Sequence, residues 1–396
     1  MTARTANRDG AGERPGLQLA AWTAGLGLLV AAGWLFLTPH AWSTLYERDL
    51  PAYQRAIDVF AAGGDPYQPS QVRHAHGLPF IAPPFVWFLY RLAAHTPLRA
   101  MFSALLMGAD VISIMALPAI LSRLLLGPGL GRIALGAGFY FTAFLGAGVF
   151  SGLVVNNGTP LYALIAFGLI PAVTRGRWLW FHLAVALATA FKPFYAAFWL
   201  VPLLADGEAR EQWAVGLMAF GAAALSYLAP LLLAPKLMAA WIHTLLTQVV
   251  GDDRLGDNLL GAMIAARHSA AAAYEAQLAF SAVLLGASLL LGRLGRTPRI
   301  AALLLAAVFL DPRAMRYDLS TAAIPLLAVV AGAVSAGRSG PMIQSVVAVV
   351  LAAAMIWFSK DTPADGFLYA GIAVAALAAA IIGSGLGPPA SPAPRR

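Results

Sequence analysis

Long apolar runs follow one another along most of this chain, and they constrain the fold more than any other feature. The first run, 17–37, has about 21 residues, enough for a helix to cross a hydrocarbon layer of roughly 30 Å. Charged residues make up only 11% of the chain, whereas a soluble domain has about 25%. Because lipid offers no partners for backbone polar groups, the sequence predicts an all-α polytopic membrane protein.

Eleven or twelve transmembrane helices fit the pattern, since the runs at 80–97 and 298–310 are short or interrupted by proline. The predicted spans are 17–37, 80–97, 100–126, 131–150, 158–173, 178–204, 211–234, 274–292, 298–310, 317–336, 341–358 and 366–383. Residues 17–383 are then a single transmembrane domain. A cytoplasmic tail, 1–16, precedes it, and a Pro/Ala-rich tail, 384–396, follows and is predicted to be disordered.

Basic residues in short connections predict the orientation, because they concentrate on the cytoplasmic side. With the N-terminus inside, twelve arginines fall inside and seven basic residues fall in short outside connections. The outside set is Arg123, Arg132, Arg175, Arg177, Arg313, Arg316 and Lys360. This orientation puts the two long polar stretches, 38–79 and 235–273, outside and the connection 151–157 inside.

The first outer loop, 38–79, is the richest polar stretch. Asp49 can cap a helix in which Leu50, Tyr53, Ile57 and Phe60 recur at three and four residues, which predicts a helix lying in the membrane interface. A carboxylate at the membrane surface also suits a general base, because partial desolvation makes it a stronger base. Cap and base therefore both remain open for Asp49. The next residues, Gly64, Asp65, Pro66 and Tyr67, predict a structural turn.

Two groups of basic residues are candidates for binding an anion. Lys192 is the only charge in its span, and an intramembrane lysine is costly unless it is paired or functional. The alternative is that it snorkels to a membrane surface, and Pro193 beside it predicts a broken helix lining a cavity. The second group is Arg313, Arg316, Tyr317 and Asp318, where guanidinium groups could bind phosphate or form solvated ion pairs.

Several kinds of chemistry find no support in the sequence. The chain has no cysteine, and its acids and histidines lack metal-ligand spacing, so we expect no metal and no other cofactor. No Walker A or dinucleotide-binding glycine pattern is present. The net charge of +8 is spread over loops, which does not indicate a nucleic-acid partner.

The polar islands together resemble glycosyltransferase family 87, a bacterial branch of the GT-C superfamily. The islands, in chain order, are Arg48-Asp49-Leu50 with Tyr53, Gly64-Asp65-Pro66-Tyr67, Lys192-Pro193, Asn258 and Asp311–Asp318. Where the family often has a late histidine pair, this chain has Arg313, Arg316, Tyr317 and Asp318.

The resemblance implies a GT-C-like bundle in the bacterial inner membrane with its site on the extracytoplasmic face. It implies transfer of a mannose-like hexose from a polyprenyl-phosphate donor to a lipid or glycan acceptor, with Asp49 as general base. The expected substrate-binding residues are Arg48, Tyr53, Lys192, Asn258, Arg313, Arg316, Tyr317 and Asp318. The alternative function is a transporter or flippase of a lipid-linked sugar or a small anion, in which polar residues would line a path across the membrane.

Overall fold

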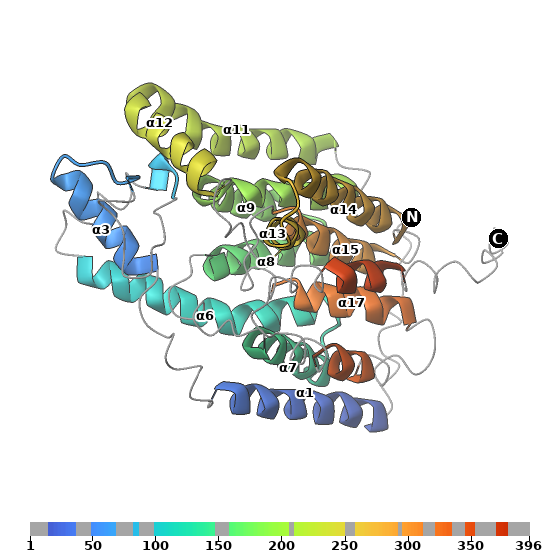
Figure 1. The fold of residues 1–396 in the computed structure, drawn as a ribbon. Coiled ribbons are helices and arrows are strands. Elements are labelled where there is room, and N and C mark those ends of the chain that lie inside the picture. The colour runs from blue at the N-terminus through green and yellow to red at the C-terminus, as the bar shows by residue number, and fades with distance from the viewer. Residues whose placement is uncertain are drawn as a thin grey trace.

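The computed structural model describes residues 15–36, 49–68, 82–86, 99–146, 158–205, 210–249, 258–291, 295–311, 321–334, 345–352 and 370–378. Every regular element in these ranges is a helix, which confirms the all-α prediction for this part of the chain (Figure 1). Four of the helices are long and apolar enough to cross a membrane, over Gly108–Leu125, Gly158–Arg175, Trp213–Leu233 and Ala270–Leu290, and several shorter apolar helices accompany them.

The labelled helices are α1 (Pro15–Phe36), α3 (Asp49–Ala61), α6 (Arg99–Leu125), α7 (Leu130–Gly146), α8 (Gly158–Arg175), α9 (Leu179–Phe191), α10 (Leu200–Ala205), α11 (Arg210–Leu233), α12 (Pro235–Thr244), α13 (Leu259–Ala265), α14 (Ala270–Leu290), α15 (Arg296–Phe309) and α17 (Ala323–Val334). A 3₁₀ helix, η2, covers Pro193–Trp199, and a π-helical turn, η3, covers Leu245–Val249.

Helices α1 and α7 pack in parallel along their whole length, because small residues let their backbones approach. A Cβ on Gly25 would lie 2.6 Å from the carbonyl carbon of Ala134, and one on Gly138 would lie 2.5 Å from the carbonyl oxygen of Gly25. Further along, the Thr142 hydroxyl donates to the Leu28 carbonyl at 2.6 Å. Close approach at small residues is the usual way that membrane helices associate.

The two ends of the bundle differ in composition. At one end, Arg296 of α15 donates to the carbonyls of Ala172 and Val173 at the end of α8, and Arg299 donates to the carbonyl of Ala205. The starts of α1 and α7 and the end of α6 lie at this end too (Figure 1). We call it the arginine end. We call the opposite end, which carries α3, α12 and α13, the loop end.

The helix at the centre of the bundle is α15. All of its residues from Ile300 to Phe309 are buried, and it packs on α14, α17, α10 and η2. A helix surrounded by protein on every side does not have to match the thickness of the lipid. This explains why the predicted span 298–310 is shorter than the others.

The predicted topology, in which 80–97 is the only crossing between Phe36 and Arg99, is wrong. Because α1 and α7 are parallel and α6 leads back into α7, Phe36 and Arg99 both lie at the loop end. A single crossing between them would have put them at opposite ends. Within 80–97 the structure describes residues 82–86, where a helix begins at Pro84, a position that suits proline because the first N–H of a helix has no partner within it. Residues 87–97 lie outside the described residues.

The prediction of one span over 178–204 is also wrong. Helix α9 leaves the arginine end after Trp178 and stops at Phe191, and the chain then returns through η2 and α10 to Ala205 at the arginine end. The segment is therefore a helical hairpin whose tip is Lys192. The break expected at Lys192-Pro193 is present, and it reverses the direction of the chain.

The two errors have opposite effects on the predicted topology, so the connections after residue 192 lie on the predicted sides. Every connection between the two errors lies on the side opposite to the predicted one. Gly158 therefore lies at the loop end, which contradicts the predicted cytoplasmic position of the connection before it. Arg123, Arg132, Arg175 and Arg177, predicted outside, lie at the same end as the start of α1. The physical reason for the second error is that Pro193 breaks the helix, so an apolar run long enough for one span forms a hairpin instead.

Candidate functional site

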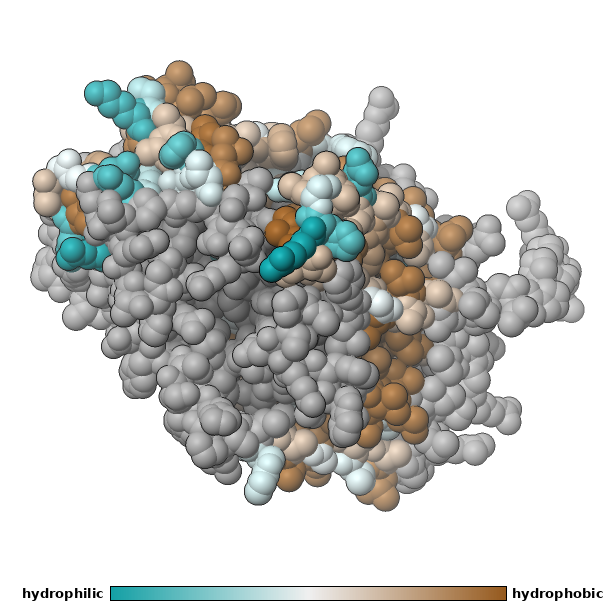
Figure 2. Space-filling model, viewed as in Figure 1, coloured by the Kyte–Doolittle hydropathy of each residue, from teal (hydrophilic) through white to brown (hydrophobic). Residues whose placement is uncertain are grey.

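Helices from both long polar loops dock on each other at the loop end. Their buried side chains form one apolar cluster, made by Ala56, Ile57, Tyr67, Ala82, Val86, Met238 and Trp241. Phe191, the last residue of α9, and Tyr227 of α11 pack against it. This loop-layer cluster includes Ala56 and Ile57 of α3, and Phe191, the neighbour of Lys192 at the hairpin tip, packs against it. Figure 2 shows hydrophilic side chains gathered over this end of the molecule.

Tyr67 connects three parts of the loop layer. Its hydroxyl donates to the Ala82 carbonyl at 2.8 Å, and its carbonyl accepts from the Thr244 hydroxyl at 3.2 Å. Its backbone N–H donates to the Asp65 carboxylate at 2.9 Å. Burial of the ring, and secondly the charge of Asp65, raises the pKa of Tyr67 above its ordinary value. The hydroxyl therefore remains protonated and able to donate.

The predicted Gly-Asp-Pro turn has a defined geometry. Helix α3 ends where the N–H groups of Gly63 and Gly64 donate to Phe60 and Val59. Gly63 takes a positive φ of 80°, which glycine adopts without strain. Asp65 then closes an Asx turn by accepting from Tyr67. In this structure the Asp65 carboxylate shapes the backbone of the turn.

Lys192 occupies the tip of the α9–η2 hairpin in an extended conformation, with φ −141° and ψ 115°. Its N–H donates to Ala188, and its carbonyl accepts from Tyr195. Tyr195 is buried and donates to the carbonyl of Gly158, the first residue of α8, at 3.2 Å. The partly buried lysine therefore lies near the N-terminus of α8, where helix dipoles favour anions.

Asn258 links the second outer loop to the end of α15. Its side-chain oxygen caps α13 by accepting from the Gly261 N–H at 3.0 Å, and its amide nitrogen donates to the Asp311 carbonyl at 2.8 Å. The side chain is 1% exposed. Both bonds are consistent with a structural role, and they hold Asp311 beside the start of α13.

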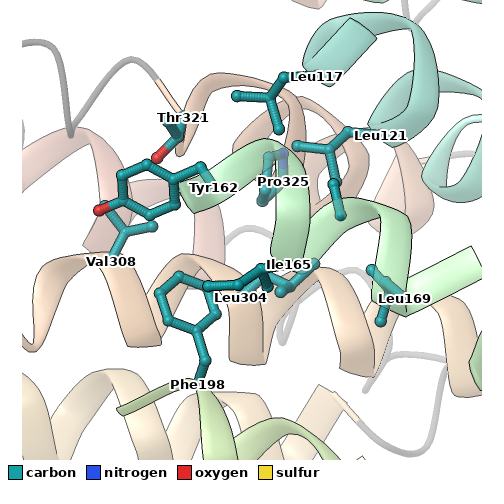
Figure 3. Close-up of a pocket in the computed structure, with 11 residues that line it drawn as sticks. Leu117, Leu121, Tyr162, Ile165, Leu169, Phe198, Leu304, Val308, Thr321 and Pro325 are labelled. Atoms are coloured by element: carbon teal, nitrogen blue, oxygen red, sulfur yellow. The ribbon is translucent and has the colours of Figure 1, made fainter. Parts of the chain in front are cut away.

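A small cavity lies between α6, α8, η2, α15 and α17 (Figure 3). Its hydroxyl-bearing residues, Tyr162 and Thr321, lie at the side nearer the loop end, whereas Leu121 and Leu169 line the side nearer the arginine end. The volume open to water is about 20 Å³, roughly the space of one water molecule. In this conformation the cavity admits no sugar.

One part of the cavity lies close to Lys192. Tyr162 is in edge-to-face contact with Tyr195, which follows Lys192 by one turn. Val308 and Thr321 also line the cavity. Arg313 and Arg316 lie between these two residues in the chain, outside the described residues.

The structure places the remaining predicted site residues as follows. Asp49 is the first residue of α3, and Tyr53 lies one turn further along that helix. Arg48, Arg313, Arg316, Tyr317 and Asp318 lie outside the described residues.

Asp110, a carboxylate in the middle of α6, is not among the site residues predicted from the sequence. The side chain is 5% exposed and lies within the apolar span Gly108–Leu125. It shares a helix face with Leu117 and Leu121, which line the cavity, and lies about 10 Å nearer the loop end than Leu117. An acid inside an apolar window was the available signal, since such residues are functional candidates by default.

Among the described residues, no three histidines, aspartates or glutamates gather closely enough to hold a metal ion. A scan against protein-family models, a search of curated proteins and a search of solved structures found no match to this chain. The function proposed below is therefore supported by the geometry of the loop end and by the resemblance of the sequence islands.

Proposed function

We propose that this protein is a membrane glycosyltransferase that uses a polyprenyl-phosphate sugar, most simply a mannose-like hexose, and a lipid or glycan acceptor. The observation that carries the proposal is the loop-layer cluster. It joins α3, whose first residue is Asp49, to Phe191, the neighbour of Lys192. A candidate base and a candidate phosphate ligand thus belong to elements that contribute to, or pack against, one apolar cluster.

The proposed chemistry needs few groups. Asp49 takes the proton of the acceptor hydroxyl, the acceptor oxygen attacks the anomeric carbon, and the polyprenyl phosphate leaves with the bonding electrons. The anomeric configuration is inverted. Lys192 and the Arg313–Arg316 segment stabilise the charge on the leaving phosphate. The prenyl chain follows the apolar walls of the cavity.

The distribution of basic residues supports an orientation for this reaction. Seven described arginines lie at the arginine end: Arg123, Arg132, Arg175, Arg177, Arg210, Arg296 and Arg299. We propose that this end faces the cytoplasm of a bacterial cell. The loop end then faces the extracytoplasmic side, where no nucleotide-sugar pool exists and a lipid-linked donor is required.

A transporter of a lipid-linked sugar or a small anion is the second candidate, and the α9–η2 hairpin is the observation that favours it. Broken helices with charged tips form substrate sites in many transporters. Against it, the cavity wall nearer the arginine end is apolar, with Leu121 and Leu169 among its residues. In the described part of the cavity, hydroxyl groups occur only at the loop-end side, which suits a one-sided enzyme.

The test uses membranes that contain the chain, a radiolabelled polyprenyl-phosphate mannose and extracted lipid acceptors. Asp49→Asn should abolish transfer while expression and thermal stability persist. Asp58→Asn, an exposed acid two turns along the same helix, should retain transfer and is the matched control. Full activity of the Asp49→Asn protein would overturn the mechanism. Movement of intact donor across vesicles by the parent without transfer would establish the transporter.

Lys192 gives a second arm of the test. A charge-assisted hydrogen bond to phosphate contributes about 1.5–3 kcal/mol, so Lys192→Met should lower kcat/KM for the donor roughly 10- to 150-fold. Lys192→Arg should recover part of this loss because it keeps the charge. If the Met variant used the donor as well as the parent, Lys192 would not bind the phosphate.

A further inference from the structure

Two arginines, Arg175 and Arg177, lie where α8 ends and the connection to α9 begins, and other groups already bond the nearby carbonyls of that helix end. The last carbonyls of a helix attract cations, but Arg296 bonds those of Ala172 and Val173 at 2.9 and 3.1 Å. The N–H groups of Gly176 and Arg177 close the same helix end. The side chains of Arg175 and Arg177 are exposed and form no hydrogen bond or ion pair with any residue in the described ranges. Their guanidinium groups therefore face outward.

An apolar stripe continues from this arginine pair along the outer face of α9. Gly176, with φ of 68°, lets α9 begin two residues after Arg177. Trp180 is 61% exposed, and Leu183 and Leu187 are exposed on the same face. The other face of α9 packs inward, with His182 against Gly216 of α11. Tryptophan beside basic residues, at the end of an exposed apolar stripe, is typical of a membrane interface.

We propose that Arg175, Arg177 and Trp180 form a binding site for the headgroup of an anionic glycerophospholipid. The two guanidinium groups bind the phosphate, and the acyl chains lie along Leu183 and Leu187. Charge complementarity selects an anionic headgroup, because a zwitterionic one brings its own cation to the phosphate. The apolar stripe selects a lipid, because a soluble anion would leave it uncovered. The site is at the arginine end, so it does not depend on the proposed transfer reaction.

The experiment is a lipid titration of the purified full-length protein in neutral detergent, followed by native mass spectrometry. The two probes are dioleoylphosphatidylglycerol and dioleoylphosphatidylcholine, which differ only in the headgroup. An Arg175→Gln/Arg177→Gln double variant should bind the anionic lipid about 30-fold more weakly than the parent. Its binding of the zwitterionic lipid should not change.

The matched control is Arg123→Gln, another exposed arginine at the same end, which should bind the anionic lipid as the parent does. Thermal unfolding of the variants checks that the fold is intact. Equal binding by the double variant and the parent would overturn the site, and an equal loss in Arg123→Gln would reduce it to general charge attraction. If glycerol 3-phosphate competed as strongly as the lipid, the ligand would be a soluble anion, and the lipid assignment would be wrong.

Discussion

Tyr67→Phe is the substitution that most directly tests how the loop layer is held together. The substitution removes one hydroxyl and leaves a ring of almost the same shape, so no cavity forms. The lost bond is the 2.8 Å hydrogen bond to the Ala82 carbonyl, in a residue that is 3% exposed. Ala82 is also buried, so its carbonyl would lose a partner that water cannot readily replace.

The expected cost follows from these facts. Leaving a buried acceptor unsatisfied costs about 1–3 kcal/mol, which corresponds to a 5- to 150-fold increase in the population of the opened loop layer. The effect should be local, because the cluster that Tyr67 joins is separate from the main core around α15. Hydrogen exchange should therefore accelerate in 56–67 and 238–244 and remain unchanged in α15.

The matched control is Tyr274→Phe. Tyr274 lies in the first turns of α14, and its hydroxyl makes no hydrogen bond with any described residue. It should leave the exchange rates of 56–67 unchanged. If Tyr67→Phe accelerated exchange no more than Tyr274→Phe, or accelerated it throughout α15, the loop layer would not be held as a separate unit by this bond.

Three further predictions follow from individual contacts. Burial raises the pKa of Tyr67, so its contribution to stability should be complete below about pH 10, the ordinary tyrosine pKa, and should decline as the pH rises above that value. In a thermal-unfolding series across pH 8–12, the stability of Tyr67→Phe should therefore decline less than that of the parent. Gly25→Ala should destabilise the protein by about 1–3 kcal/mol because the new Cβ meets the α7 backbone, whereas Gly27→Ala, with open space around it, should be neutral or slightly stabilising in the same unfolding assay. Asn258→Ala should cost about 1–3 kcal/mol through the lost cap of α13 and the lost bond to Asp311, and Asn258→Asp, which keeps the cap, should lie between that variant and the parent.

The positions of most helices could be predicted because they depend on local patterns. Apolar runs of sufficient length define α1, α6, α8 and α11 within a few residues. The spacing of Ile57 and Phe60 predicted an apolar face on α3, and in the structure Ile57 is buried and Phe60 partly buried against other residues of the loop layer. The position of this helix in a membrane interface stays a prediction. Lys192-Pro193 predicted a helix break for the reason that the structure gives, the missing N–H of proline.

The pairing of the two outer loops could not be predicted in this way. Tyr67 bonds to Thr244, and no local pattern in either segment specifies the other. Tyr67 carries the hydroxyl that reaches Ala82, yet the sequence indicated only a turn. Asp110 lies inside an apolar span and not in one of the polar loops on which the site prediction was based. One acid inside an apolar span indicates function more strongly than several acids in a solvated loop.

The two wrong crossings show why hydropathy alone leaves the path of such a chain ambiguous. The run at 80–97 and the run at 178–204 are both apolar, but prolines interrupt each of them, at Pro83-Pro84 and at Pro193. The first run lies in the chain between Phe36 and Arg99, which are both at the loop end. The second run turns back at Lys192. The basic residues distinguish the observed path from the predicted one. On the observed path, the end that holds Arg296 and Arg299 also holds Arg123, Arg132, Arg175 and Arg177. Arg99 lies at the opposite end. A path that gathers more arginines at one end agrees better with the rule that basic residues set membrane orientation. The positions of the charges and of the prolines, taken together, therefore favour the observed path over the predicted one.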